Sequence, residues 1–271
     1  MNLKNKIIAF IGAGNMGEAL IRGLLAAGIV KPHQIIAADV RQDRLESLEK
    51  AFGVRTTLDA AAAVKEANVI LLAVKPQQMR EALASCRDGT EGKLFISIAA
   101  GIPTTKIESI LGDAPRVVRV MPNTPALVGA GAAAVCKGQH AGEDDMATAE
   151  TILGATGITI RTEEKFLDAV TALSGSGPAY IFLVAEAMIK AGTEAGLRED
   201  ISRTLTMHTI LGAAKLLLES GDTPAELRRK VTSPGGTTEA ALKVMADHKL
   251  VETFVAAILA ATKRGHELSG S

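Results

Sequence analysis

The chain has 271 residues, which is enough for one large domain or two modest ones. Its 30 basic and 30 acidic side chains give a formal net charge of zero, which argues against a nucleic acid or an anionic membrane surface as the main partner. Hydrophobic residues make up 47% of the chain but aromatic residues only 3%. We therefore expect a core built from Ala, Val, Ile and Leu.

Cysteine usage and the uncharged runs bear on the cellular compartment. Cys86 and Cys136 match no metal-binding or redox spacing, so we expect two reduced thiols and no metal site. We find no signal-peptide pattern ahead of the first strand pattern. The longest uncharged runs, 120–136 and 169–185, are interrupted by prolines or by a Gly-Pro pair, and we expect neither to span a membrane. These features are typical of a cytoplasmic protein.

A glycine-rich motif follows the first predicted strand. The apolar run 7–11 predicts a strand buried on both faces of a parallel sheet, and apolar residues at helical spacing follow the motif. Gly12 allows a tight turn, Gly14 lets a pyrophosphate approach the backbone, and Gly17 lets the helix lie close to the strand. The free N–H groups at the helix start favour phosphate. We predict a dinucleotide site at Gly12, Ala13, Gly14, Asn15, Met16 and Gly17; the alternative is a glycine turn without a ligand.

The second predicted strand, 34–39, carries conflicting signals about the cofactor. Asp39 lies at the distance from the motif, about 20 residues, at which an acidic residue binds the ribose of NAD. Arg41 and Arg44 follow in the same loop and can hold the 2′-phosphate of NADP. The alternative for both arginines is the solvated first turn of a helix over 41–52. The preference between the two cofactors stays open on these residues.

Further strands, predicted at 69–74, 95–99 and 116–121, alternate with helices, so we expect a parallel sheet covered on both faces. Ligands of such sheets bind beyond the carboxyl ends of the strands. Lys75 stands at one such end, either as a general acid or as a solvated loop residue. Asn123 lies in a rigid polar loop that can bond the nicotinamide amide or form a simple turn. The candidate cofactor residues of these turns are Ala73, Val74, Lys75, Pro76, Ala99, Ala100, Gly101 and Asn123.

The pattern changes after two final strands, predicted at 129–135 and 157–160. Beyond them only helices are predicted, so we expect one domain over 1–162 and an all-helical one over 163–271. The helix that begins near Gly177 is apolar almost all round, and such a helix is normally buried on every side. We expect a two-fold dimer interface to cover it. The alternative is a monomer in which the helix packs under its own sheet domain.

Two polar, glycine-rich segments, 174–178 and 232–238, precede predicted helices. Their backbone N–H groups can bind a small carboxylate without any Lys or Arg; the alternative is ordinary helix caps with glycine turns. The five histidines form no cluster with an acid, so an alcohol substrate would lack a proton donor. A cyclic imine removes that need, because its protonated carbon–nitrogen bond accepts hydride directly. The hydroxyl of Thr238 can then bond the ring nitrogen.

Six segments resemble those of pyrroline-5-carboxylate reductases over the whole chain. They are FIGAGNMGEAL at 10–20, AVKP at 73–76, IAAG at 98–101, RVMPNTPALVG at 119–129, SGSGPAY at 174–180 and VTSPGGTTEAAL at 231–242. The resemblance implies NAD(P)H-dependent reduction of 1-pyrroline-5-carboxylate to L-proline, the last step of proline synthesis. It implies an α/β fold with an N-terminal Rossmann-type domain, followed by an all-helical domain that forms a homodimer, and dimers that can assemble into larger rings.

The resemblance also implies roles for individual residues. Thr238 is the expected catalytic residue, aimed at the ring nitrogen, and Glu164 is a weaker substrate contact at the domain junction. The full expected substrate set is Ser176, Glu164, Ser233, Gly235, Gly236, Thr237 and Thr238. NADPH is the expected cofactor, with NADH as the alternative. The rival functions are a non-catalytic NAD(P)-sensing dimer and a relative of the hydroxyacid dehydrogenases, which needs a catalytic lysine in the helical half.

Overall fold

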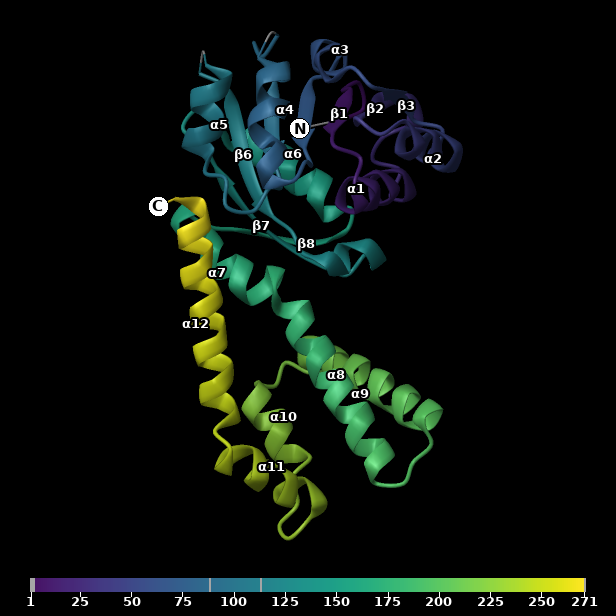
Figure 1. Cartoon of the computed structure of the whole chain (residues 1–271), viewed down its shortest axis with the longest axis vertical. Helices are drawn as coiled ribbons and strands as arrows, with labels where there is room; N and C mark the ends of the chain where they lie inside the picture. The colour runs from purple at the N-terminus through teal and green to yellow at the C-terminus, as the bar shows by residue number, and fades with distance from the viewer. Residues whose placement is uncertain (1–2, 88, 113, 271) are drawn as a thin grey trace. The chain divides into compact units, whose positions relative to one another are not determined.

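We analysed the protein in a computed structural model that describes residues 3–87, 89–112 and 114–270. The chain divides into two compact units, which we treat separately (Figure 1). The first contains Met1–Ser176 together with Ala261–Ser271, and the second contains Gly177–Ala260. The functional boundary expected between residues 162 and 163 stays a prediction, since compactness alone does not define a domain's role.

The first unit is built on a sheet whose strands lie in the order β3-β2-β1-β4-β5-β6-β7-β8. The first six follow the doubly wound order of dinucleotide-binding folds, which confirms the expected Rossmann-type architecture. The strands are β1 (Ile8–Ile11), β2 (Ile35–Ala38), β3 (Arg55–Thr57), β4 (Val69–Leu72), β5 (Leu94–Ser97), β6 (Arg116–Met121), β7 (Gly131–Lys137) and β8 (Gly157–Arg161).

Helices cover both faces of this sheet. Side chains alternate along each buried strand, so Ile8 and Phe10 of β1 join one core while Ala9 and Ile11 join the other. The first core is closed by α1 (Asn15–Ala26), α2 (Gln42–Phe52) and α6 (Glu143–Gly154). The second is closed by α3 (Ala60–Glu66), α4 (Met79–Cys86) and α5 (Thr104–Leu111). The carboxyl ends of the parallel strands therefore stay free of helices and open to a ligand.

Two features of the sheet differ from the expectation. Strand β7 pairs with β6 in the antiparallel direction, because only the short 3-10 turn η3 (Thr124–Val128) separates them and a parallel crossover needs a dozen or more residues. Strand β3 was not predicted. It has three residues, none of them buried, and carries no apolar run that a sequence pattern could reveal.

The predicted break at residues 174–178 is helical instead of a loop. After η4 (Glu164–Phe166) and α7 (Leu167–Val170), residues Thr171–Gly175 form a π-helical turn, and α8 (Gly177–Glu194) follows. The Ser176 N–H donates to the Thr171 carbonyl at 2.8 Å, so this N–H is not free for a ligand. Pro178 is tolerated because it falls in the first turn of α8, where a proline costs no helical hydrogen bond.

The second unit contains α8, α9 (Glu199–Glu219), α10 (Pro224–Lys230), α11 (Thr237–Asp247) and the first half of α12 (Leu250–Ser269). Helices α8 and α9 pack closely where Gly192 meets the buried Ser202, since a Cβ on Gly192 would lie 2.7 Å from the Ser202 hydroxyl. No residue of α8 is buried within the single chain. The helices of this unit therefore leave the apolar side chains of α8 uncovered.

One helical run among the described residues, Glu164–Glu194, is long and apolar enough to cross a membrane, judged by length and composition alone. Its mean hydropathy over the most apolar window is 1.3, and 6% of that window is buried. A single such helix is weak evidence for a span. An interface between subunits produces the same pattern of exposed apolar residues in an isolated chain.

Candidate active site

A cleft lies at the carboxyl ends of the strands, where the strand order reverses between β1 and β4. The turns after β1, β2, β4 and β5 all line it, as expected for a doubly wound sheet. The predicted cofactor residues in its wall are Gly12, Gly14, Asn15, Met16, Asp39, Arg41, Ala73, Val74, Lys75, Pro76, Ala99 and Ala100. Ala13, Gly17, Arg44, Gly101 and Asn123 were predicted as well but do not line the cleft.

The fold does not require a glycine equally at the three positions of the motif. Gly12 has a φ of +97°, and a Cβ there would lie 2.8 Å from the Ala73 backbone. A Cβ on Gly17 would lie 2.9 Å from the Gly12 carbonyl oxygen. At Gly14 the φ is an ordinary −69°, and an added Cβ would meet no atom within 4 Å. The fold therefore requires Gly12 and Gly17, whereas Gly14 borders open space at the start of α1, which no side chain caps.

Asp39 and its neighbours close one end of the cleft. The Asp39 carboxylate accepts the N–H of Ala13 at 2.7 Å and the N–H of Arg41 at 3.0 Å. Arg44 is held away from the cleft, because its guanidinium pairs with Glu18 and donates to the Ala13 carbonyl at 2.6 Å. The Arg41 side chain is 56% exposed and lies 3.7 Å from Asp39. Of the two predicted arginines, only Arg41 lines the cleft.

Part of this wall was not predicted from the sequence. Leu58 and Asp59, between β3 and α3, and Ala60 and Ala61, at the start of α3, line the cleft beside Val40. They follow the short edge strand β3, which has no hydrophobic periodicity, so the sequence pattern did not predict them as site residues. Leu58 and Val40 are 59% and 82% exposed, and they offer apolar surface to a flat ring. The wall beyond β4 and β5 adds Ser85, Ile98 and Pro122 among others.

The side chain of Asn123 forms hydrogen bonds with other residues of the protein in this structure. Its side-chain amide donates to the Ser174 hydroxyl at 3.1 Å, and its side-chain oxygen accepts the N–H of Ala132 at 2.9 Å. The predicted contact with nicotinamide stays a prediction. The observed bonds join the loop after β6 to the π-helical turn.

Glu164 bonds to the protein through both of its carboxylate oxygens. One carboxylate oxygen accepts the Thr104 N–H at 2.7 Å and an Arg119 N–H at 3.0 Å, and the other accepts the Thr104 hydroxyl at 2.7 Å. Arg119 is only 5% exposed on β6, so Glu164 supplies the charge that a buried guanidinium needs. The predicted role of Glu164 as a substrate contact is untested.

The second glycine-rich segment forms a tight turn before α11. Gly235 has a φ of +72° and donates its N–H to the Glu239 carboxylate at 2.7 Å. Gly236 donates its N–H to the Ser233 carbonyl at 3.0 Å. Thr237 and Thr238 are the first two residues of α11, whose N-terminus no side chain caps. Glu239 was not predicted; it stabilises the turn from within the first helical turn.

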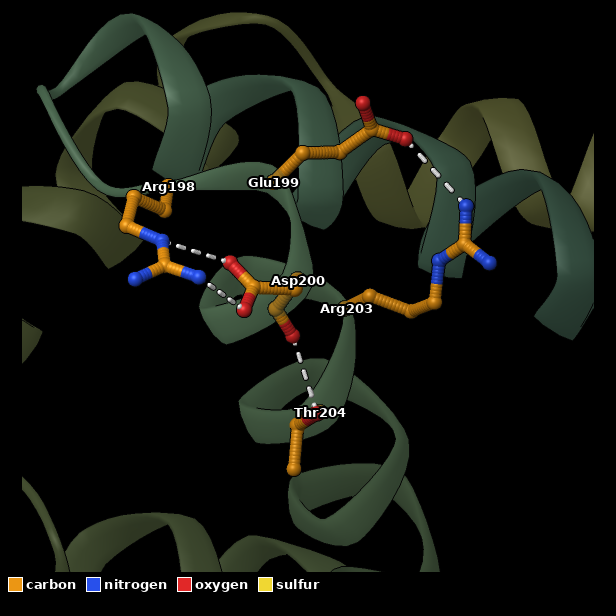
Figure 2. Close-up of a pocket in the computed structure, with 5 residues that line it drawn as sticks. All are labelled: Arg198, Glu199, Asp200, Arg203 and Thr204. Carbon is orange, nitrogen blue, oxygen red and sulfur yellow. Dashed lines mark hydrogen bonds and ion pairs between the residues drawn. The ribbon is translucent and has the colours of Figure 1, made fainter.

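A shallow hollow in the second unit offers no comparable chemistry (Figure 2). It lies at the start of α9, and its charged side chains neutralise one another. Arg198 pairs with Asp200 at 2.7 Å, and Arg203 pairs with Glu199 at 3.2 Å. Thr204 donates its hydroxyl to the Asp200 carbonyl at 2.9 Å. We assign no ligand to it.

The two cysteines are free, as expected. Burial raises the pKa of the Cys86 thiol to about 11 and that of Cys136 to about 12. Both are therefore protonated at neutral pH and are poor nucleophiles. Within the described residues, no group of three His, Cys, Asp or Glu side chains is arranged to hold a metal ion.

The doubly wound sheet and the glycine-lined cleft define a dinucleotide-binding protein. Two family profiles match the chain: "NADP oxidoreductase coenzyme F420-dependent" at residues 7–101, and "Pyrroline-5-carboxylate reductase dimerisation" at residues 164–268. The chain is 42% identical to the pyrroline-5-carboxylate reductase of Methanosarcina acetivorans over 98% of its length and 99% of the relative's.

Solved structures agree with this match. The reductase from Coxiella burnetii superposes with a TM-score of 0.92 at 41% identity, covering 97% of this chain and 98% of the other. The Plasmodium falciparum enzyme, solved with NADP bound, superposes with a TM-score of 0.88 at 30% identity, covering 98% of both chains. The chain belongs to the pyrroline-5-carboxylate reductase family. This excludes the hydroxyacid-dehydrogenase alternative.

Proposed function

We propose that this protein reduces 1-pyrroline-5-carboxylate to L-proline with a reduced nicotinamide dinucleotide, in the cytoplasm, as the final step of proline biosynthesis. The observation that carries the proposal is family membership over both units, together with an open cleft in front of Gly14. The imine carbon gains a hydride and the nitrogen gains a proton, so the ring becomes a secondary amine while the nicotinamide is oxidised. The dinucleotide supplies the hydride when bound.

The protein's own residues bind and orient the two reactants. The free N–H groups at the start of α1 suit the pyrophosphate, because the positive end of the helix dipole lies there. We expect the substrate carboxylate at the uncapped start of α11, against the turn of Ser233, Gly235 and Gly236. The N–H groups of the two glycines already bond within this turn, so the first N–H groups of the helix, from Thr237 on, are the donors that we propose for it. Thr238 offers a hydroxyl that can donate to the imine nitrogen or accept from its protonated form. No acid with a shifted pKa is needed, because a protonated imine accepts hydride directly.

We infer a preference for NADPH over NADH, with Arg41 as the group that recognises the 2′-phosphate. Both oxygens of Asp39 already accept backbone N–H groups, which leaves this carboxylate less available to a ribose diol. Arg41 is exposed at the cleft, whereas Arg44 is occupied by Glu18. A guanidinium bonds a phosphate in a charge-assisted geometry that a hydroxyl cannot reproduce.

Arg41→Ala should raise the KM for NADPH roughly tenfold and leave the KM for NADH unchanged, since one charge-assisted hydrogen bond contributes about 1.5–3 kcal/mol. The measurement is oxidation of each cofactor, with and without 1-pyrroline-5-carboxylate, with L-proline identified as the product. Arg22→Ala, which removes an exposed guanidinium of α1, is the control. If the enzyme uses NADH better than NADPH and Arg41→Ala changes neither KM, then Asp39 determines the cofactor preference. Oxidation of neither cofactor would support the non-catalytic sensor.

We also propose that residues 163–271 form the dimerisation and substrate-binding domain of a homodimer, from which larger rings assemble. In the isolated chain the apolar residues of the second unit face solvent, and Leu218 is 85% exposed. Soluble chains rarely expose so much contiguous apolar surface unless a partner covers it. The exposed apolar residues of this unit include Ile181, Phe182, Leu183, Met188, Leu205, Met207, Leu211, Leu216, Leu217, Leu218, Val244, Met245, Val251, Val255 and Leu259.

The dimer should survive dilution, because the hydrophobic surface that it buries is exposed in each separate chain. Sedimentation at micromolar concentration is expected to give twice the chain mass of 28.1 kDa, or a multiple of that dimer. A species of 28.1 kDa would refute the homodimer. Low salt and high salt should give the same result, since apolar burial is not screened.

A further inference from the structure

The loop between β5 and α5 forms part of the cofactor cleft. Ile98, Ala99 and Ala100 line the wall, and Gly101 turns the chain with a φ of +69°. Helix α5 then begins at Thr104, which is only 3% exposed. A loop that ends in a helix start has a conformation set largely by the groups that hold that start.

Glu164 holds this helix start from a distant part of the chain. Its carboxylate accepts both the backbone N–H and the hydroxyl of Thr104, each at 2.7 Å. No side chain next to Thr104 in the sequence caps the helix. Glu164 therefore does what an N-cap residue does, and its negative charge also suits the positive end of the helix dipole.

The same carboxylate reaches the neighbouring strand. It pairs with Arg119 of β6 at 3.0 Å, and β6 leads to Pro122 in the cleft wall. Glu164 thus connects the two elements that flank the side of the cleft beyond β4. In a doubly wound fold whose adenosine half lies over β2 and β3, this side receives the nicotinamide.

The segment that carries Glu164 is itself fixed. Asp168, one turn further on, pairs with His266 of the last helix at 2.8 Å, and Gly265 packs against the same aspartate. The end of this last helix also lies beside the loop, because a Cβ on Gly101 would be 3.8 Å from the Leu268 backbone. The segment that carries Glu164 therefore packs against the last helix.

We propose that Glu164 is a positioning residue that sets the nicotinamide side of the cofactor cleft through Thr104 and Arg119, and that it does not bind the substrate. The inference rests on the proposed function, since it assumes that the cleft holds a dinucleotide. Both carboxylate oxygens are occupied by protein donors. A substrate ammonium or iminium would have to displace the charge that compensates Arg119, which is costly for a buried guanidinium.

The test separates cofactor binding from substrate binding. Thr104→Val removes the hydroxyl at nearly constant volume, Thr104→Ser restores it, and Glu164→Gln removes the charge. Glu163→Gln is the matched control, because its carboxylate is 68% exposed and pairs only with Lys165 in the described structure. NADPH affinity is measured by fluorescence titration without substrate, and the KM for 1-pyrroline-5-carboxylate is measured at saturating NADPH.

We expect Thr104→Val and Glu164→Gln to raise the dissociation constant of NADPH roughly three- to tenfold while the KM for the imine stays within about twofold. Thr104→Ser and Glu163→Gln should match the wild type. A raised KM for the imine with unchanged NADPH affinity in Glu164→Gln would make Glu164 a substrate contact. Unchanged NADPH affinity in Thr104→Val would overturn the proposal even if Glu164→Gln fails to fold. Failure of the wild type to bind either NADPH or NADH would refute the proposed function instead.

Discussion

Gly14→Val is expected to weaken NADPH binding roughly ten- to a hundredfold while the protein keeps its fold and thermal stability. Nothing in the protein lies within 4 Å of a Cβ at this position, and its φ is ordinary. The added side chain would instead occupy the space proposed for the pyrophosphate. Overpacking of a tight contact costs about 1–3 kcal/mol, which corresponds to that loss of affinity. Fluorescence titration and a melting curve measure the two effects.

Two other glycines give the controls for this prediction. Gly154→Val, at the end of α6, also meets open space, but outside the cleft, and should leave NADPH binding unchanged. Gly12→Val should unfold or strongly destabilise the protein, because its Cβ would clash with the Ala73 backbone at 2.8 Å. If Gly14→Val binds NADPH as tightly as the wild type does, the cofactor does not lie against this loop.

Thr238→Ala is expected to lower kcat roughly a hundredfold and leave the NADPH dissociation constant unchanged. A positioned proton donor or acceptor contributes about 10²–10⁴ to rate, and a neutral hydroxyl belongs at the lower end. Thr238 lies in the first turn of α11, so its loss should not disturb the helix cap. Steady-state kinetics on the homogeneous enzyme measure kcat.

Thr238→Ser should recover much of the lost rate, since it restores the hydroxyl. Thr204→Ala serves as the control, because Thr204 is an exposed threonine whose hydroxyl bonds only the Asp200 carbonyl among the described contacts. A kcat unchanged in Thr238→Ala would remove the proposed role of this hydroxyl. The imine would then be held by backbone groups alone.

The dinucleotide cleft could be predicted from the sequence because its signals are local. One stretch of chain contains a buried strand, three spaced glycines and an amphipathic helix. Each of these features was expected on local physical grounds, and the structure contains all three. The strands that follow were visible for the same reason, since fully buried parallel strands read as unbroken apolar runs. The apolar helix α8 was equally visible, and none of its residues is buried in the single chain.

The contacts that the sequence did not reveal are those between residues distant in the chain. The pairing of Arg44 with Glu18 depends on how α2 packs beside α1, so the loop pattern could not show that this arginine is occupied. The bonds from Glu164 to Thr104 and from Asn123 to Ser174 likewise cross from one element to another. The residues past β3 were missed because an exposed three-residue edge strand has no hydrophobic pattern.

The π-helical turn shows that local residue preferences do not always predict the backbone conformation. Ser, Gly and Pro at 174–178 predict a loop by their local preferences, yet the chain remains helical there. The extra residue of a π turn is accommodated by the bond from the Ser176 N–H to the Thr171 carbonyl. Such turns occur often at functional sites, and this one lies directly against Asn123.

The most direct test of the central claim follows the hydride itself. The enzyme is given 1-pyrroline-5-carboxylate and NADPH that carries deuterium at the transferable position of the nicotinamide, and the proline formed is analysed by mass spectrometry and NMR. We expect L-proline with one deuterium, on the ring carbon that was double-bonded to nitrogen. Proline without deuterium, or no proline at all, would contradict direct reduction of the imine by this protein.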